Sequence, residues 1–244
     1  MTSELWLDKA LSTNKDFQNK LVCVVNDYAI FDEVIKNNEN LADFEITDFD
    51  NREENVAITK RYNSFIEENV ANNADDFWVL FVHQDFGFME NPNPMLKAMD
   101  KASIWGAVGV NLYKGLFLGK DGFKPSITIA WGRILQGNND FNFKEYGRKI
   151  WFKKTVDAVD CCCVMVHSSL IKKYNLRFDE NLSFHMYAEE LCYRAKKDHK
   201  IKSKVVPMKC FHLGKGNLNE EFSNSVKYLK EKFKINRVPS TCRN

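Results

Sequence analysis

The tripeptide His83-Gln84-Asp85 follows directly on an unbroken apolar run from Phe77 to Val82. Such a run of aromatic and β-branched residues is typical of a strand that is buried on both faces of a parallel sheet. In open α/β sheets, ligands bind beyond the carboxyl ends of the strands. An imidazole and a carboxylate at that position could hold a divalent metal and the phosphates that it neutralises. The alternative is structural, with Asp85 capping the loop and His83 packed against its neighbours.

Acidic residues also follow the two preceding apolar segments. Asp27 comes after the run 21–25, and Asp50 comes after a short run that begins at Phe44. Segments with helical spacing lie between these runs, so the first third of the chain predicts a β-α-β-α-β unit with parallel strands. The carboxyl ends of parallel strands share one sheet edge, so Asp27, Asp50 and Asp85 are expected to converge on a nucleotide there. The chain contains neither GxGxxG nor GxxxxGK[ST], which argues against a dinucleotide oxidoreductase or a P-loop enzyme.

Two further apolar runs, 104–110 and 156–166, are each predicted as one strand. Asp160 interrupts the second run, and an acid within an apolar strand is costly unless it is paired or functional. The segment 111–150 between them is rich in glycine and is expected to form loops and short strands over the mouth of the site. Trp131 in this segment could stack on a sugar ring or pack in the core.

Glu189 and Glu190 stand in the first turn of a helix that is predicted from Ala188 onward, where the helix dipole favours acids. They are either functional or part of a solvated charged face. His212 lies in a predicted loop that also contains Gly214, Lys215 and Gly216, and it is either a structural residue or a ligand.

The bulk composition indicates a globular protein. The 244 residues are 44% hydrophobic, and a formal net charge of +2 argues against nucleic acid as a partner. No apolar run approaches the roughly 20 residues needed to cross a bilayer, and the N-terminus, where 3–20 predicts an amphipathic helix, lacks a secretory signal. Seven cysteines without a CxxC spacing indicate buried thiols. The chain is expected to be cytoplasmic, and the basic outer face of a helix predicted at 219–235 allows weak peripheral association with a membrane.

Together these segments resemble the family 2 glycosyltransferases of the GT-A fold, and in particular the bacterial subgroup with His-Gln-Asp in place of Asp-x-Asp. The resemblance runs in order from about residue 20 to 235. The segments that carry it are Asn26-Asp27, Tyr62-Asn63, Leu80 to Asp85, Trp105 to Val110, Val156 to Asp160, Phe178-Asp179-Glu180, Phe184 to Tyr187, Glu190 to Ala195, and Phe211 to Gly214.

The resemblance implies one α/β domain with a mixed, mostly parallel central sheet that is flanked by helices. Residues of about 20–110 would form the nucleotide-binding half, and about 111–216 the acceptor and catalytic half. The segment of about 219–235 would be the C-terminal helix.

The resemblance also implies a role for each matching residue. A Mn²⁺ or Mg²⁺ ion would be held by Asp85 with His83 and His212. The donor nucleotide would contact Asn26, Asp27, Asp50, Asn63 and Lys215. The donor or acceptor sugar would face Asp160.

The sequence departs from the subgroup at the catalytic base. An inverting transferase needs a carboxylate that takes the proton from the acceptor hydroxyl. After Phe-His-x-Tyr the subgroup usually has Asp-x-Asp-Leu-Cys, whereas this chain has Ala188-Glu189-Glu190-Leu191-Cys192. The base is therefore Glu190, which keeps the register and is preferred, or the shifted Glu189, or it is absent.

The function expected from the resemblance is metal-dependent transfer of a sugar, with inversion, from a nucleoside diphosphate to a glycan, lipid-linked or small-molecule acceptor. Two alternatives stay open. A nucleotidyltransferase also uses a nucleotide-binding sheet and a metal-binding carboxylate. A protein that binds sugar nucleotides or glycans without catalysis is the other, because Ala188 replaces an acid.

Overall fold

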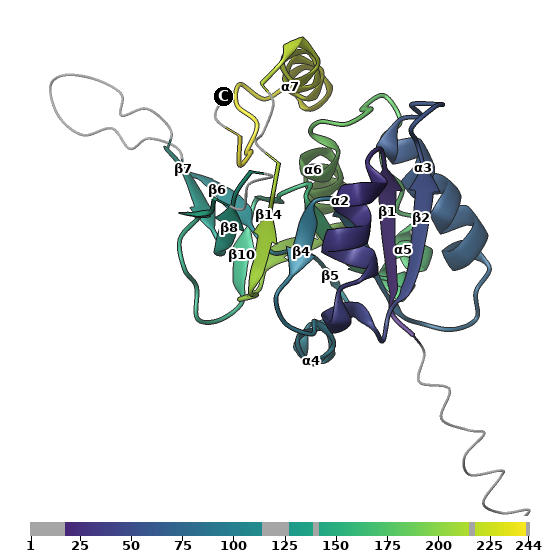
Figure 1. Ribbon diagram of the computed structural model, residues 1–244. Coiled ribbons are helices and arrows are strands. Elements are labelled where there is room, and N and C mark those ends of the chain that lie inside the picture. Colours follow the sequence, from purple (N-terminus) through teal and green to yellow (C-terminus); the bar gives the residue numbers. More distant parts are fainter. Residues whose placement is uncertain (1–17, 114–126, 139–141, 215–217, 243–244) are drawn as a thin grey trace, which may run out of the picture.

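The computed structural model describes residues 18–113, 127–138, 142–214 and 218–242 (Figure 1). The helix predicted at 3–20 therefore lies almost wholly outside the described residues, and Lys215 lies outside them as well. No helix within the described ranges is long and apolar enough to cross a membrane.

A seven-stranded sheet forms the centre of the molecule, with the strand order β10-β13-β5-β12-β3-β1-β2. Strands β1, β2, β3, β5 and β13 run in one direction, and β12 and β10 run in the other. The prediction of a mixed, mostly parallel sheet in an α/β fold is confirmed.

The N-terminal half is the expected β-α-β-α-β unit, in which the three strands alternate with helical segments that have one apolar face. Its three strands pair in parallel, with β1 between the other two. In chain order its elements are β1 (Lys20–Val25), α2 (Tyr28–Phe31), the π-helix η1 (Asp32–Lys36), the 3-10 helix η2 (Glu39–Leu41), β2 (Glu45–Asp50), α3 (Ile58–Phe65), the π-helix η3 (Ile66–Ala71) and β3 (Trp78–His83).

Two predicted strands are each divided in the structure. The run 104–110 forms β5 (Ser103–Gly106) in the central sheet and β6 (Gly109–Tyr113) in a second sheet. The run 156–166 is likewise shared among β10 (Lys154–Val156), β11 (Ala158–Val159) and β12 (Cys163–His167). An apolar run marks burial but not the point at which the chain leaves one sheet for another, which explains both errors.

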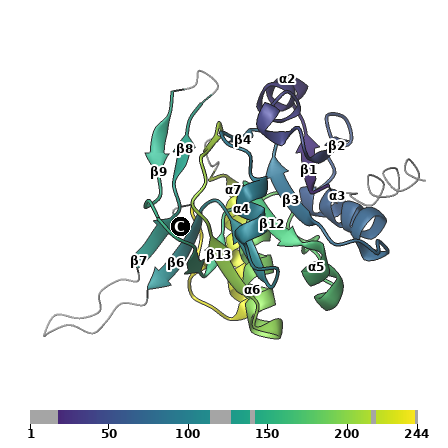
Figure 2. The ribbon, with the colours of Figure 1, turned by 90° about the horizontal axis from the view of Figure 1, so that it is seen from below.

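Two smaller sheets stand beside the central one. The first has the order β11-β6-β7, and the second has the order β4-β14-β8-β9. Figure 2 shows the β6–β7 and β8–β9 hairpins on the opposite side of the molecule from β2 and α3. The short strands predicted within 111–150 are thus confirmed in the described part, as β7 (Ile127–Trp131), β8 (Ile134–Gln136) and β9 (Lys144–Tyr146).

The segment at His212 is a strand and not the predicted loop. Residues Cys210–His212 form β14, which pairs antiparallel with β4 (Phe86–Phe88) and parallel with β8. The register places His212 opposite Phe86. This pairing brings the late histidine to the end of β3.

Apolar side chains cover both faces of the central sheet. Alternate residues of β3 show the division, because Phe81 belongs to one buried cluster and Leu80 to the other. The remaining elements are α4 (Asn93–Ala98), α5 (Ser168–Tyr174), α6 (Tyr187–His199), β13 (Lys202–Val205) and α7 (Glu220–Phe233). All seven cysteines are free thiols, as expected.

The β4–β14 contact depends on a glycine. A Cβ atom added at Gly87 would overlap the ring of Phe211 on the partner strand. We expect Gly87→Ala to lower the free energy of unfolding by about 1–3 kcal/mol, as overpacking does in a tight core. Urea denaturation of Gly87→Ala, Phe211→Ala and the double variant measures the coupling. If the double variant loses at least the sum of the single losses, the steric explanation is wrong.

Candidate metal and catalytic site

Three metal-ligating side chains meet at the carboxyl end of β3. His83 ends this strand, Asp85 lies in the turn before β4, and His212 ends β14. One ligand atom from each of the three lies within 4.8 Å of those of the other two. The side chains are partly buried, so the cluster borders on solvent without being open to it. The structure thus brings together the three residues that the resemblance assigned to a metal.

Hydrogen bonds fix the tautomer of His83. The Tyr187 hydroxyl donates its one proton to the carbonyl of Cys161 over 2.7 Å, and it lies 3.0 Å from His83 Nε2. His83 Nε2 therefore donates to the hydroxyl oxygen, and Nδ1 keeps a free lone pair. Burial lowers the pKa of His83 to about 4, so the ring is neutral at pH 7, as a metal ligand must be.

His212 and Asp85 form a directly hydrogen-bonded pair. His212 Nε2 lies 3.2 Å from Asp85 Oδ1, and Gln136 Nε2 lies 3.1 Å from His212 Nδ1 on the other side of the ring. Burial alone would lower the pKa of His212, but Asp85 raises it above its usual value. Burial would raise the pKa of Asp85, and His212 and His83 instead bring it to about 2. Asp85 is thus ionised at neutral pH, and it could serve as the anionic ligand of a metal ion beside His212.

The residues present fit a divalent metal. Besides the donor set, Gly214 leaves open the space beside the carboxylate, since a Cβ atom there would lie 2.6 Å from Asp85 Oδ2 and 3.1 Å from the His212 ring. Two imidazoles and one carboxylate favour a transition-metal ion such as Mn²⁺ over Mg²⁺, which prefers oxygen ligands and water.

The loops that end β1 and β3 are tied together by Gln84. Its Oε1 accepts hydrogen bonds from the backbone nitrogens of Asn26 (2.7 Å) and Asp27 (3.0 Å). The Asp27 carboxylate caps the short helix α2 through the nitrogen of Ala29. Since Gln84 spans the two strand ends, the polar residues predicted at these ends do share one edge of the sheet.

Asp50 ends β2 at the same edge. It is half-exposed and binds Arg52 through a 2.7 Å ion pair, and this guanidinium lowers the pKa of Asp50. Arg52 also lies over the ring of Tyr28. A nucleotide at this edge would therefore meet a charged pair and an aromatic ring. Contact of Asn26, Asp27 or Asp50 with a nucleotide stays a prediction.

Asn63 and Trp131 are used elsewhere in the structure. Asn63 is buried in α3, and its amide exchanges hydrogen bonds with the backbone of Phe178 at 2.9 and 3.0 Å. Trp131 is half-buried between Arg148 and Lys154. Both residues thus have structural partners. Contact of Asn63 with the donor and of Trp131 with a sugar stays a prediction.

Asp160 and Glu189 form a second acidic layer, and the charge of Asp160 acts on both His83 and His212. Asp160 accepts hydrogen bonds from the Cys162 nitrogen and the Thr241 hydroxyl. Burial would raise the pKa of Asp160, and these bonds instead lower it. Glu189 is 4% exposed, and one of its carboxylate oxygens has no hydrogen-bond partner within the described chain. Burial, and then the charge of Asp160, raises the pKa of Glu189 to about 8.

Glu190 faces away from this layer into an ion-pair network. Its fully buried carboxylate binds Arg194 at 2.8 Å and Lys232 at 2.8 Å, and Lys232 also pairs with Asp179. The network joins α6 to α7. Adjacent helix positions differ by about 100° in direction, which explains why only one of the two glutamates points toward Asp160.

The residues that orient the site were not predicted, because each of them acts through a contact with a segment that is distant in the sequence. They are Gln84, Gln136, Tyr187, Gly214 and Thr241. Gln84 gave a signal, since it stands inside the His-Gln-Asp motif. Thr241 gave none, because it reaches Asp160 from the far end of the described chain.

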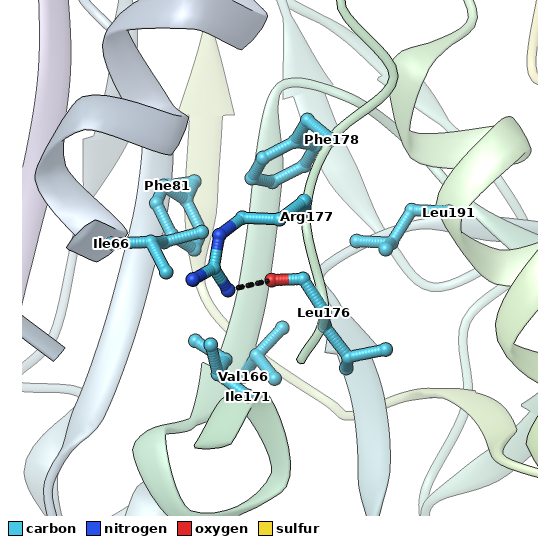
Figure 3. A pocket seen from close by; sticks show the side chains of 8 residues that line it. All are labelled: Ile66, Phe81, Val166, Ile171, Leu176, Arg177, Phe178 and Leu191. Atoms are coloured by element: carbon cyan, nitrogen blue, oxygen red, sulfur yellow. Dashed lines mark hydrogen bonds between the residues drawn. The ribbon is translucent and has the colours of Figure 1, made fainter. Parts of the chain in front are cut away.

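A separate hollow in the core carries no comparable chemistry. Figure 3 shows it lined by apolar side chains, with Arg177 as its one charged residue. The guanidinium of Arg177 donates hydrogen bonds to the Leu176 carbonyl and to the Glu67 carboxylate. This hollow is therefore a packing feature.

Glu190 tests the structural network. Glu190→Gln would leave two cations facing a neutral amide, and we expect a loss of about 3 kcal/mol in the free energy of unfolding. Guanidinium denaturation measures it, with Glu231→Gln on the exposed face of α7 as the matched control. Equal stability of the two variants would show that the network contributes nothing.

Glu189 tests the raised pKa. The folded-state value of about 8 lies above the ordinary 4.5, so the unfolded state loses its proton first and stability falls as pH rises between these values. We expect the free energy of unfolding of Glu189→Gln to exceed that of the wild type by an amount on the order of 4 kcal/mol at pH 8, and to match it near pH 4.5. Denaturation curves across this range decide, with the exposed Glu68→Gln as control. A constant difference at every pH would contradict a protonated Glu189.

Comparison with known proteins yields a distant structural likeness. No protein-family model matches the chain, and no curated protein sequence matches it. A crystal structure of S. aureus TarS, a glycosyltransferase, is similar with a TM-score of 0.44 and 14% sequence identity. The likeness covers 91% of this chain and 40% of that chain, so this chain spans about two-fifths of the length of the TarS chain. At this distance the assignment of function depends on the site itself.

Proposed function

We propose that the protein transfers a sugar from a nucleoside-diphosphate donor to an acceptor hydroxyl, with a metal ion held by His83, Asp85 and His212. The observation that carries this proposal is the meeting of these three ligands at the carboxyl end of β3, beside the polar ends of β1 and β2. A parallel half-sheet binds nucleotides at that edge. A diphosphate that extends from a nucleotide at this edge would reach the metal ligands.

Some residues would hold the metal ion, and others orient the residues that hold it. When bound, the metal would supply positive charge to the leaving diphosphate, which is the main electrostatic demand of such a transfer. His83 and His212 are held by Tyr187 and Gln136, so both rings are oriented before a ligand arrives. Gln84 fixes the β1 loop, which would hold the base and ribose.

The acceptor must lose a proton, and Glu189 is the base that the geometry favours. Glu190 is neutralised by Arg194 and Lys232 and is fully buried. Glu189 lies next to Asp160, and with a pKa of about 8 only its ionised fraction near neutral pH could accept the proton. A base whose pKa lies near the working pH combines a usable ionised fraction with a high proton affinity. The Thr241 hydroxyl binds Asp160 and Ser240 binds Glu189, so an acceptor that reached these acids would have to displace both contacts. Inversion of the anomeric centre follows if the acceptor attacks directly.

The covered acids also favour a second candidate, a protein that binds a sugar nucleotide without transferring the sugar. Two observations favour it: Glu189 is mostly protonated at neutral pH, and the Thr241 hydroxyl occupies Asp160. Nucleotidyl transfer remains a third reading of the same edge. The product identifies each case: nucleoside diphosphate for glycosyl transfer, monophosphate or pyrophosphate for nucleotidyl transfer, and bound donor alone for the binding protein.

The test combines binding with product analysis. We expect Mn²⁺ with the correct nucleoside diphosphate, at 100 times its dissociation constant, to add about 2.7 kcal/mol of stability, and therefore several degrees in melting temperature. Sugar nucleotides with Mn²⁺ should release nucleoside diphosphate when an acceptor is present. Asp85→Asn should abolish both effects, because it removes the anionic ligand.

The control for that experiment is Asp198→Asn, an equal change of charge on the exposed end of α6. It should melt and react as the wild type does. If Asp85→Asn retains the metal-dependent shift and the release of diphosphate, the proposed site is wrong.

A further inference from the structure

The loop between β9 and β10 exposes two adjacent aromatic side chains. We call residues 148–154, Arg-Lys-Ile-Trp-Phe-Lys-Lys, the basic aromatic tip. Trp151 is 74% exposed and Phe152 is 84% exposed, more than any other large apolar side chain in the described ranges. Large apolar side chains that stand together in water mark an interaction site more often than single ones do.

The basic aromatic tip is fixed on the fold at both ends. Arg148 pairs through its backbone with Ala130 (2.9 Å) and Gly132 (3.0 Å) of the β7 region. Ile150 is buried in the core, and Lys154 begins β10, which pairs with β13. The two aromatic side chains therefore project from an anchored loop and are not part of a frayed end.

Positively charged residues share the loop with the exposed rings. Four of the seven residues of the tip are Lys or Arg, and none is acidic. The nearest acids in the sequence are Glu145 and Asp157, which form ion pairs with Arg133 and Lys196. The Lys149 ammonium lies 4.0 Å from the centre of the Trp151 ring. The tip thus presents aromatic surface and uncompensated cations at one place.

This combination is complementary to the surface of an anionic bilayer. Trp is favoured at the depth of lipid headgroups, where an aromatic body and a polar N–H are both satisfied. Lys and Arg side chains beside it gain from the negative surface potential of anionic lipids. We propose that the basic aromatic tip docks the protein on a bilayer with anionic headgroups, with Trp151 and Phe152 inserted and the four cations above the headgroups. This proposal goes beyond the proposed function and does not depend on it.

Vesicle flotation of the full chain tests the electrostatic part. We expect binding to phosphatidylcholine vesicles that contain phosphatidylglycerol, weak binding to pure phosphatidylcholine, and release by salt. Lys149→Gln with Lys153→Gln should weaken binding roughly 30-fold, since each removed charge is worth about fivefold. Lys202→Gln with Lys227→Gln makes the same change of charge on β13 and α7 and should bind as the wild type does.

The insertion of the aromatic side chains has its own readout. Trp151→Ala with Phe152→Ala should reduce binding at least about tenfold, because the inserted apolar area is lost. Leu218→Ala, at a side chain that is 54% exposed, is the matched control. Trp151→Phe should keep most of the binding but lose the blue shift of tryptophan fluorescence on adding vesicles. Equal melting temperatures of all variants establish that each is folded.

Three outcomes overturn the proposal. The first is absence of flotation with anionic vesicles at low salt. The second is equal or greater weakening by Lys202→Gln with Lys227→Gln, which would move the contact to another face of the molecule. The third is tight binding to a soluble polyanion such as heparin that anionic vesicles fail to displace, which would identify a different class of partner.

Discussion

The antiparallel pairing of β4 with β14 sets the relative position of Asp85 and His212, and the rest of the site depends on it. The first residue lies in the turn that leads into β4, and the second ends β14 opposite Phe86. Because a sheet register cannot slip by one residue without turning every side chain over, this pairing also decides that the imidazole faces the carboxylate. The three ligands are thus positioned by backbone hydrogen bonds, and Tyr187 and Gln136 only orient the rings.

The carboxyl groups near the three ligands differ in their protonation state. Asp85 and Asp160 are held ionised by donors or cations, whereas Glu189 is kept protonated by burial and by the charge of Asp160. Glu190 has two cationic partners and belongs to the packing of α7 on α6. Burial therefore separates four nearby carboxyl groups into different roles, as desolvation and neighbouring charge commonly do in functional sites.

The sequence allowed the central features to be predicted where local pattern and tertiary structure agree. The β-α-β-α-β unit followed from apolar runs and helical spacing, and the motif at the end of β3 predicted that metal-ligating side chains would gather there. The division of the runs 104–110 and 156–166 between sheets could not be predicted, because burial looks the same in either sheet. The orientation of Glu189 and Glu190, and the contact of Thr241 with Asp160, depend on which distant segments pack against them. The spacing of residue types along the sequence contains no information on such contacts.

The insertion of β12 between β3 and β5 has a consequence for folding. The parallel unit β1–β2–β3 is local in sequence, but its sheet stays open at β3 until a strand from much later in the chain enters antiparallel beside it. The strand β14 must then find β4 across a comparable separation. Contacts between distant parts of a chain form slowly, because the entropy of closing the loop is lost before they are made. We therefore expect the side chains of His83, Asp85 and His212 to come together late in folding, after the parallel unit has formed.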